Sequence, residues 1–161
     1  MQRRAFFLSG AAAFAGCGFE LRQAPQVPFR TMALLGFAAN SQLAAAVKQR
    51  LAASQVQVID APARADAVLE AFTEAREKSV VTSTSAGQVR EVQLRVKLRF
   101  RVATANGRLL LAVDELLLTR DMSYTETAAL AKAQEETLLY RAMEDDIAAQ
   151  VLRRLAAIKP A

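Results

Sequence analysis

The clearest pattern in the chain is a strict alternation of apolar and polar side chains over residues 91–102. The apolar positions are Val92, Leu94, Val96, Leu98, Phe100 and Val102. This period of two predicts a strand with one buried and one wet face, because successive strand side chains point to opposite sides of a sheet. Asn106-Gly107 then favours a tight hairpin turn. Residues 109–120 are predicted as the next strand, and we expect it to be central because it is mostly apolar on both faces.

Two further strands are predicted earlier in the chain. Residues 68–83 carry β-branched and aromatic side chains with polar residues between them, and they lead to a turn candidate at residues 85–88. A first strand is predicted near residues 30–36. The apolar run at residues 56–59 stands shortly before Pro62, and it is either a short strand or a packed connection.

Two segments have the period of an amphipathic helix. Asn40 or Ser41 can cap the first one, whose apolar positions recur at every fourth residue: Leu43, Val47 and Leu51. The second covers residues 127–158, and Ser123 with Glu126 is predicted to form a capping box at its start. Its apolar stripe consists of Leu139, Met143, Ile147, Val151, Leu155 and Ile158.

The order of these elements is strand, helix, three-stranded meander, helix. It predicts an α+β fold, a two-layer sandwich in which two helices pack on one face of a four-stranded mixed sheet. We assign residues 30–161 to this single domain and residues 17–29 to a tether that precedes it.

The first residues are typical of an export signal. Arg3 and Arg4 precede a short apolar stretch that ends directly before Cys17. The stretch is too short to cross a bilayer, which takes roughly 20 apolar residues. Small residues before a cysteine resemble the lipobox of bacterial lipoproteins, so residues 1–16 are predicted to be a signal peptide and Cys17 the lipidated first residue of the mature chain. The alternative is an ordinary buried thiol in an N-terminal helix.

The residue after this cysteine indicates to which membrane the lipoprotein is sorted. It is Gly18, whereas an Asp there resembles the inner-membrane retention signal of Gram-negative lipoproteins. We therefore expect a lipid anchor in the outer membrane, with the domain on the periplasmic side. The paired arginines also resemble a twin-arginine motif, so the sequence leaves open whether the general secretory or the twin-arginine route is used.

Composition removes most enzyme classes. The 161 residues include no His, no Trp and one Cys, which excludes His-based acid/base catalysis, Ser-His or Cys-His pairs and Cys/His zinc sites. A hydrophobic share of 53% suits one domain with a core. The formal charge of +5 suits an anionic ligand or surface without identifying one.

A family resemblance rests on three short motifs in a fixed order together with the lipobox and the meander. The motifs are Cys17-Gly18-Phe19-Glu20-Leu21-Arg22, Ala129-Leu130-Ala131-Lys132 and Gln150-Val151-Leu152-Arg153-Arg154-Leu155. The whole mature chain thus resembles the LptE (RlpB) family. Its members are outer-membrane lipoproteins that plug the lumen of the barrel LptD and help to deliver lipopolysaccharide to the outer leaflet. The resemblance implies an α/β sandwich, an LptD-type barrel and lipopolysaccharide as partners, and no catalytic activity.

The resemblance also implies where lipopolysaccharide binds, at basic residues near the tip of one hairpin and at the start of the last helix. Lys132 matches the helix motif, and Arg90 is the nearest basic residue to a hairpin tip that has none of its own. We expect both side chains to be exposed. For Lys132 the alternative is a surface lysine paired with Glu136 one helical turn away.

A second candidate site lies on the wet face of the alternating strand. Arg95, Lys97, Arg99 and Arg101 recur there roughly 7 Å apart, a spacing suited to several phosphates of a polyanionic headgroup. The alternative is a solvated sheet face whose cations are balanced by acids on neighbouring strands: Glu70, Glu74 or Glu115.

Three functions are compatible with these features. The leading hypothesis is the non-catalytic assembly lipoprotein described above, with no cofactor, no metal and no nucleic-acid partner. The runner-up is an accessory lipoprotein of a phospholipid or solute transporter of the ABC type. The third is a hydrolase that uses carboxylates alone, which is disfavoured because neighbouring acids in the runs at 135–136 and 144–146 diverge around a helix.

Overall fold

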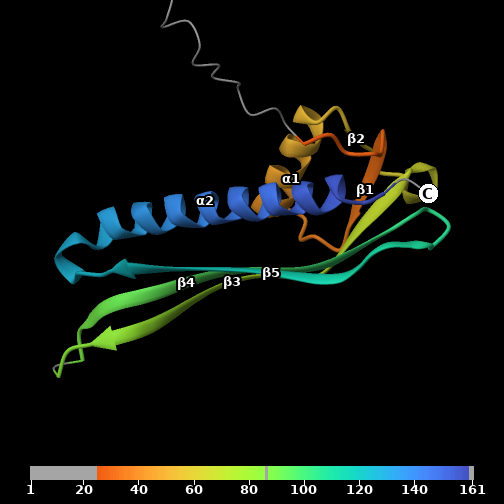
Figure 1. The fold of residues 1–161 in the computed structure, drawn as a ribbon. Helices are drawn as coiled ribbons and strands as arrows, with labels where there is room; N and C mark the ends of the chain where they lie inside the picture. The colour runs from red at the N-terminus through yellow and green to blue at the C-terminus, as the bar shows by residue number, and fades with distance from the viewer. Residues whose placement is uncertain (1–24, 86, 160–161) are drawn as a thin grey trace, which may run out of the picture.

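The computed structural model describes residues 25–85 and 87–159, which form two helices over one face of a five-stranded sheet (Figure 1). The strand order is β2-β1-β3-β4-β5. The strands are β1 Thr31–Leu35, β2 Gln57–Val58, β3 Ala67–Ser83, β4 Val89–Ala103 and β5 Leu109–Ser123. The helices are α1 Gln42–Ala53 and α2 Ala129–Ala156, with short 3-10 turns at Pro62–Arg64 and Glu126–Ala128. The α+β prediction is confirmed, but the sheet has five strands where the sequence predicted four.

The additional strand is the apolar run that the sequence left undecided. β2 pairs in parallel with β1, with Thr31 opposite Gln57 and Met32 opposite Val58. β1 also pairs in parallel with β3, so it lies between the two. A two-residue strand has no period of its own, and only the presence of β1 beside it makes it a strand.

β3, β4 and β5 form the predicted meander of long antiparallel strands. Gly107 adopts a φ of 81° in the second hairpin, the conformation that the Asn-Gly pair favours. We predicted that β5 would be a central strand, but it lies at the outer edge of the sheet. The prediction was wrong because consecutive hairpins place the third strand of a meander last, while β1 takes the place on the far side of β3. Leu109, Val113 and Leu117 of β5 are accordingly about half exposed.

The two helices, α1 and α2, begin differently. The Ser41 hydroxyl accepts a hydrogen bond from the Ala44 amide at 2.8 Å, so the predicted cap of α1 is confirmed. The predicted capping box of α2 is wrong, because the residue before this helix is Ala128 and makes no side-chain cap. Ser123 lies at the end of β5, where its hydroxyl accepts a hydrogen bond from the Lys132 ammonium instead.

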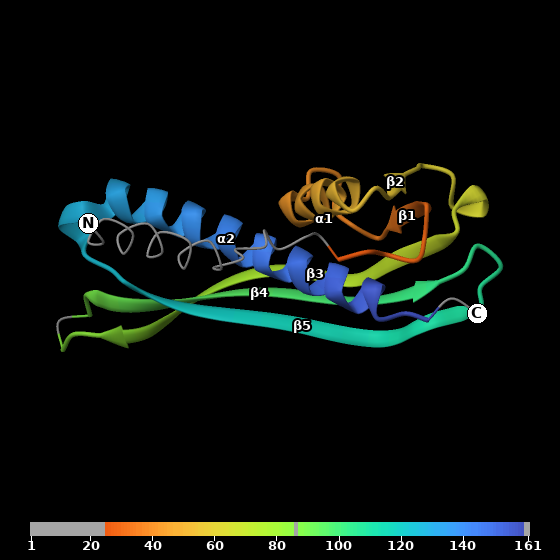
Figure 2. The same cartoon turned by 45° about the horizontal axis from the view of Figure 1, so that its top comes forward.

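The core fills the space between the helices and the sheet (Figure 2). All six apolar residues of the alternating strand are buried, as predicted. They meet Leu43, Val47 and Leu51 of α1 and the middle of the predicted α2 stripe from Met143 to Leu155, while Leu139 and Ile158 at its ends are partly buried. Burying each such side chain stabilises the fold by roughly 1.5–3 kcal/mol, which fixes both helices to the same face.

The opposite face of β3, β4 and β5 carries no helix in either view (Figures 1 and 2). We call this surface the open face. None of the helices in the described part of the chain is long and apolar enough to cross a bilayer.

Candidate functional site

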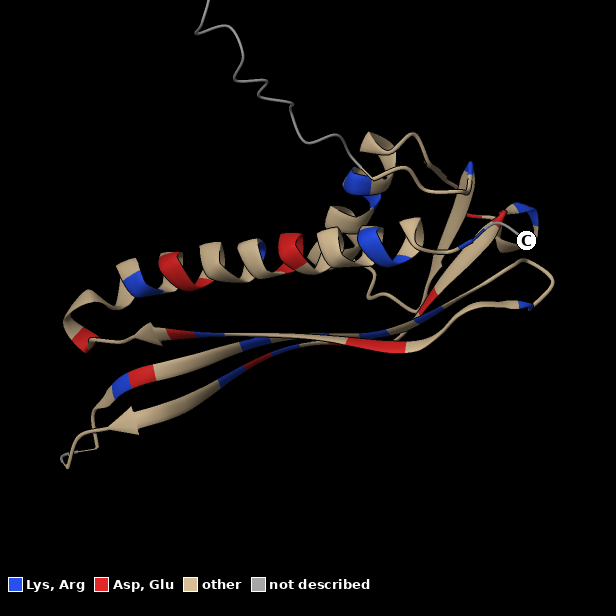
Figure 3. Ribbon diagram, viewed as in Figure 1, with Lys and Arg blue, Asp and Glu red and all other residues tan. Residues whose placement is uncertain are grey.

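The predicted row of cations lies on the open face of β4, and the neighbouring strands β3 and β5 carry acidic as well as basic positions (Figure 3). Lys97 forms an ion pair with Glu115 of β5 at 3.3 Å. Arg101 forms one with Glu70 of β3, with Nη2 2.7 Å from the carboxylate oxygen. Two of the three acids that we expected to balance the row therefore do so.

The other two cations of the row differ from each other. Arg95 donates two hydrogen bonds to the Gln93 side-chain oxygen, at 2.9 and 2.6 Å. Arg99 stands between Thr73 and Glu115 in the strand register, and it makes no ion pair within 4 Å among the described residues. The open face therefore keeps basic groups that are not fully matched by its own acids.

The third acid expected to balance the row lies elsewhere. Glu74 is on the helix side of β3, where its carboxylate accepts hydrogen bonds from the Ser41 hydroxyl and the Ala38 amide. A register shift between Ala71 and Thr73 moves the following residues of β3 to the other side relative to the residues before it. No local sequence pattern marked this bulge.

The bulge also brings an aromatic ring to the open face. Phe72 is about half exposed, and the Arg101 guanidinium lies 5.3 Å from its ring centroid. With Leu117 and Val113 of β5 it adds apolar surface beside the charged row. Exposed apolar side chains interleaved with cations are typical of a surface that contacts a partner.

The two predicted lipopolysaccharide residues lie at one end of the molecule, where the hairpin of β3 and β4 and the start of α2 extend in the same direction (Figure 1). The Lys132 ammonium bonds to the Ser123 hydroxyl at 3.1 Å and to the Glu135 carboxylate at 2.8 Å. The Tyr124 amide donates to the Arg90 carbonyl at 2.8 Å. Both residues therefore adjoin the connection between β5 and α2.

The surroundings of Lys132 differ from both expectations. Its side chain is 17% exposed, so it is partly buried where we predicted an exposed one, whereas Arg90 is exposed as predicted. The acid that pairs with Lys132 is Glu135 rather than Glu136. Glu136 instead binds Lys78 of β3 at 2.6 Å.

Lys78 is a third cation at this end that sequence reasoning missed. Its ammonium lies 5.8 Å from the centre of the Tyr124 ring. We call Lys78, Arg90, Lys132 and Tyr124 the end cluster. Four exposed apolar side chains belong to the same ends of β3 and α2: Val80, Val81, Leu130 and Leu138. Phosphate groups and acyl chains are the two chemistries that such an end can contact.

An ion pair with a buried acid holds α2 over β3. Arg76 Nε donates to Glu144 Oε1 at 2.6 Å, and Glu144 is 3% exposed. The Arg76 guanidinium lies 5.3 Å from the ring centre of Tyr140, whose hydroxyl donates to the Glu77 carbonyl at 2.8 Å. Burial raises the pKa of the Glu144 carboxyl, against the opposing effect of the Arg76 hydrogen bond.

The acidic runs of α2 do not converge, as their helical spacing predicted. Glu135 binds Lys132 and Glu136 binds Lys78, while Glu144 and Asp146 bind Arg76 and Arg120. Across residues 25–85 and 87–159, no three His, Cys, Asp or Glu side chains are grouped to hold a metal ion.

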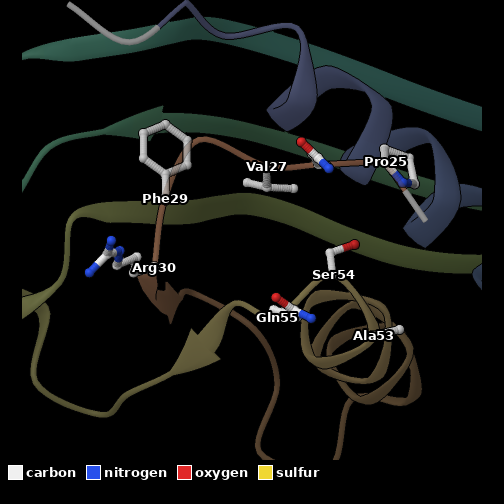
Figure 4. A pocket seen from close by; sticks show the side chains of 8 residues that line it. Pro25, Val27, Phe29, Arg30, Ala53, Ser54 and Gln55 are labelled. Carbon is white, nitrogen blue, oxygen red and sulfur yellow. The ribbon is translucent and has the colours of Figure 1, made fainter. Parts of the chain in front are cut away.

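Two clefts in the described part of the chain lie away from the predicted site residues. One of about 490 Å³ separates residues 25–30 from the end of α1. Val27 and Phe29 line one side of it and Ser54 and Gln55 the other (Figure 4). Another of about 500 Å³ lies beside the start of α1.

Comparison with known proteins identifies the family. A model of the LptE family, described as Lipopolysaccharide-assembly, matches residues 29–155. The chain belongs to the LptE family. The LPS-assembly lipoprotein LptE of Pectobacterium atrosepticum is 28% identical over 152 residues, covering 89% of this chain and 79% of that protein. The protein of the same name from Yersinia enterocolitica is 29% identical over 150 residues, covering 91% and 72%.

Solved structures agree with this assignment. The solution structure of lipoprotein B from Nitrosomonas europaea superposes with a TM-score of 0.72 at 27% identity, covering 87% of this chain and 91% of that one. The LptE family is non-catalytic, so this chain is not an enzyme. Cys17, the predicted lipidation site, lies outside the described residues.

Proposed function

We propose that this protein is an outer-membrane lipoprotein that acts in lipopolysaccharide assembly together with an LptD-type β-barrel. The observation that carries the proposal is the family match over residues 29–155, which spans every strand of the sheet and nearly all of α2. The lipobox before Cys17 and the Gly18 that follows it support an anchor in the outer membrane, with the domain facing the periplasm.

The barrel contact is assigned to the open face, in a plug that occupies the barrel lumen. A barrel lumen is mostly polar, and a plug needs a charged surface that tolerates enclosure. The row from Arg95 to Arg101 with its acidic partners Glu70 and Glu115 has this character. Phe72 and Leu117 supply the apolar contacts that strengthen a permanent interface.

Lipopolysaccharide is assigned to the end cluster. Lys132 and Arg90 are the leading residues and Lys78 supports them. Lys132 contacts Ser123, while Arg90 and Lys78 contact Tyr124, and cations at one end of the molecule can meet clustered phosphates with charge-assisted hydrogen bonds. Arg95, Lys97, Arg99 and Arg101 rank second, since a barrel wall over the open face would engage them first.

The test is a pulldown of the full-length lipoprotein from outer membranes with mild detergent. We expect a one-to-one complex with a large barrel protein. Rebuilding the hairpin at residues 85–90 or the turn at 103–108 should abolish the complex while circular dichroism of the domain stays unchanged, because both loops lie at the ends of the sheet. A protein that runs as a free monomer in every extract would refute the plug.

A further inference from the structure

β3 has a free backbone edge along its second half. β1 pairs with β3 only from Ala67 to Glu70, whereas β4 pairs with it as far as Ser83. Within the described chain no strand lies on the β1 side of β3 beyond Glu70. In the ribbon views this half of β3 runs past β1 towards the hairpin (Figures 1 and 2).

The register identifies the residues whose polar backbone groups face this edge. The Tyr124 amide of the β5 end donates to the Arg90 carbonyl of β4. Even-numbered residues of β4 therefore turn their N–H and C=O groups to β5, and odd-numbered ones turn theirs to β3. Since Arg95 is opposite Glu77, the residues that face away from β4 are the intervening ones: Arg76, Lys78 and Val80.

Natural sheets protect their edges against added strands with proline, bulges or charges that project across the edge. The register of β3 shifts between Ala71 and Thr73 and again between Val80 and Thr82, so only the segment between these shifts is regular. The register from Thr73 to Val80 is unbroken, and the segment contains no proline. The side chains of Arg76 and Lys78 are held to α2 by Glu144 and Glu136. Residues 79–85 carry no charge at all.

The outer edge of β5 is different. Its register with β4 is unbroken from Asp114 to Ser123, and it shifts only nearer the start of β5, where Leu111 and Leu109 pair with Val102 and Ala103. Charged residues also recur along it, at Asp114, Glu115, Arg120 and Asp121. On β5 too, Asp114 and Arg120 are held to α2, by Arg154 and Asp146. The edge of β3 differs from that of β5 in the uncharged run at residues 79–85, which extends from the end of its regular segment.

We propose that the edge of β3 from Arg76 to Val80 accepts an extended segment of the barrel partner, which adds a strand to the sheet. This inference rests on the proposed function. Three residues with outward-facing groups offer up to about six main-chain hydrogen bonds, two from each. The edge also borders the open face, so a strand bound there continues the surface assigned to the barrel.

A second copy of this chain fits the edge less well. Antiparallel pairing of two β3 edges centred on this segment brings Lys78 of one copy opposite Lys78 of the other, with Arg76 opposite Val80. Like charges opposite each other on neighbouring strands destabilise a sheet. A partner strand with acidic or uncharged side chains at these positions meets no such repulsion.

The test uses the full-length lipoprotein expressed together with the barrel protein of the same source. Lys78→Pro removes an edge-facing N–H that takes no part in the pairing with β4, so the domain should fold. Lys78→Ala removes the same ion pair with Glu136 but keeps the N–H. We expect Lys78→Pro to recover at least about tenfold less barrel than Lys78→Ala, through lost hydrogen bonds and a blocked approach. Val80→Pro with Val80→Ala forms a second pair, in case Lys78→Pro fails to fold.

Hydrogen exchange supplies an independent readout. The amides of residues 76, 78 and 80 should exchange rapidly in the free lipoprotein and slowly in the complex, while those of Glu77 and Ser79 are protected in both. Equal barrel recovery by the two Lys78 variants, or unprotected edge amides in the complex, overturns the strand addition and leaves the proposed function standing. If the edge amides are protected in the free lipoprotein and its mass is that of a dimer, the edge is occupied by a second copy of the chain. This result also overturns strand addition by the barrel. Failure of the wild type to recover any barrel refutes the proposed function itself.

Discussion

The guanidinium of Arg76 on β3 and the carboxylate of Glu144 on α2 form an ion pair in which one partner is 43% exposed and the other only 3%. The acid is therefore buried against the sheet, while the base reaches it from the free edge of β3. Such a pair joins two elements that are far apart in sequence, and removing one member leaves the other with its desolvation cost uncompensated.

Loss of the base should consequently destabilise the domain. We expect Arg76→Ala to lower the free energy of unfolding by about 1–3 kcal/mol, because the Glu144 carboxylate is left buried without its donor. Arg101→Ala on the open face is the matched control, since its partner Glu70 is 36% exposed and this pair should contribute less than about 1 kcal/mol. Urea denaturation measures both. Equal losses of unfolding free energy in the two variants would show that the Arg76–Glu144 pair contributes no more than the exposed pair.

The same carboxyl should make stability depend on pH. Burial raises the pKa of Glu144 in the folded state above its usual value of 4.5. The folded state thus holds this proton more tightly, so the wild type should lose stability relative to Glu144→Gln as the pH rises from about 4.5 through the raised pKa. Melting curves of the two proteins across this range measure the difference. A constant difference in melting temperature would mean that Glu144 titrates normally.

Gly36 should be the more sensitive of two glycines with similar backbone conformations. Gly36 has a φ of 78° and Gly107 a φ of 81°. A Cβ at Gly36 would lie 2.0 Å from the Ala71 carbonyl oxygen, whereas one at Gly107 meets nothing within 4 Å. We expect Gly107→Ala to cost about 1 kcal/mol from the left-handed backbone alone and Gly36→Ala to cost several kcal/mol more. Thermal unfolding compares them, and similar losses would contradict the close approach.

The end cluster should respond to the loss of two charges. Lys132→Gln together with Arg90→Gln should weaken binding of labelled lipopolysaccharide about tenfold or more and reduce its salt dependence, because fewer ionic contacts remain to be screened. Neutral substitutions are preferable, since an acid at position 132 would stand beside Glu135. The control is Arg95→Gln with Arg99→Gln on the open face. Unchanged affinity in the first variant, with unchanged circular dichroism, would remove Lys132 and Arg90 from the site.

Lipidation should depend on the sulfur atom of Cys17. Cys17 holds the only thiol of the chain, so Cys17→Ala should abolish fractionation with outer membranes and leave an uncleaved precursor. Several acyl chains at about 0.8 kcal/mol per buried CH₂ are ample for stable anchoring, and nothing else in the described chain supplies a membrane-crossing helix. Mass spectrometry of the membrane fraction checks this. An unshifted mass in the wild type would refute the lipobox assignment.

Local periodicity was sufficient for most elements and for which side of each is buried. The alternation from Val92 to Val102 predicted both the strand and its dry face, and the stripe from Met143 to Leu155 predicted the buried side of α2, because these patterns depend on backbone geometry within one element. Which strands lie side by side and which side chains pair was decided only by the tertiary structure. β5 lies at the edge because β1 returns beside β3, and Glu136 pairs with Lys78 of another element instead of Lys132 in its own helix. Such contacts depend on strand order and on the bulge at Phe72, which are set by packing between segments far apart in the chain and leave no local pattern in the sequence.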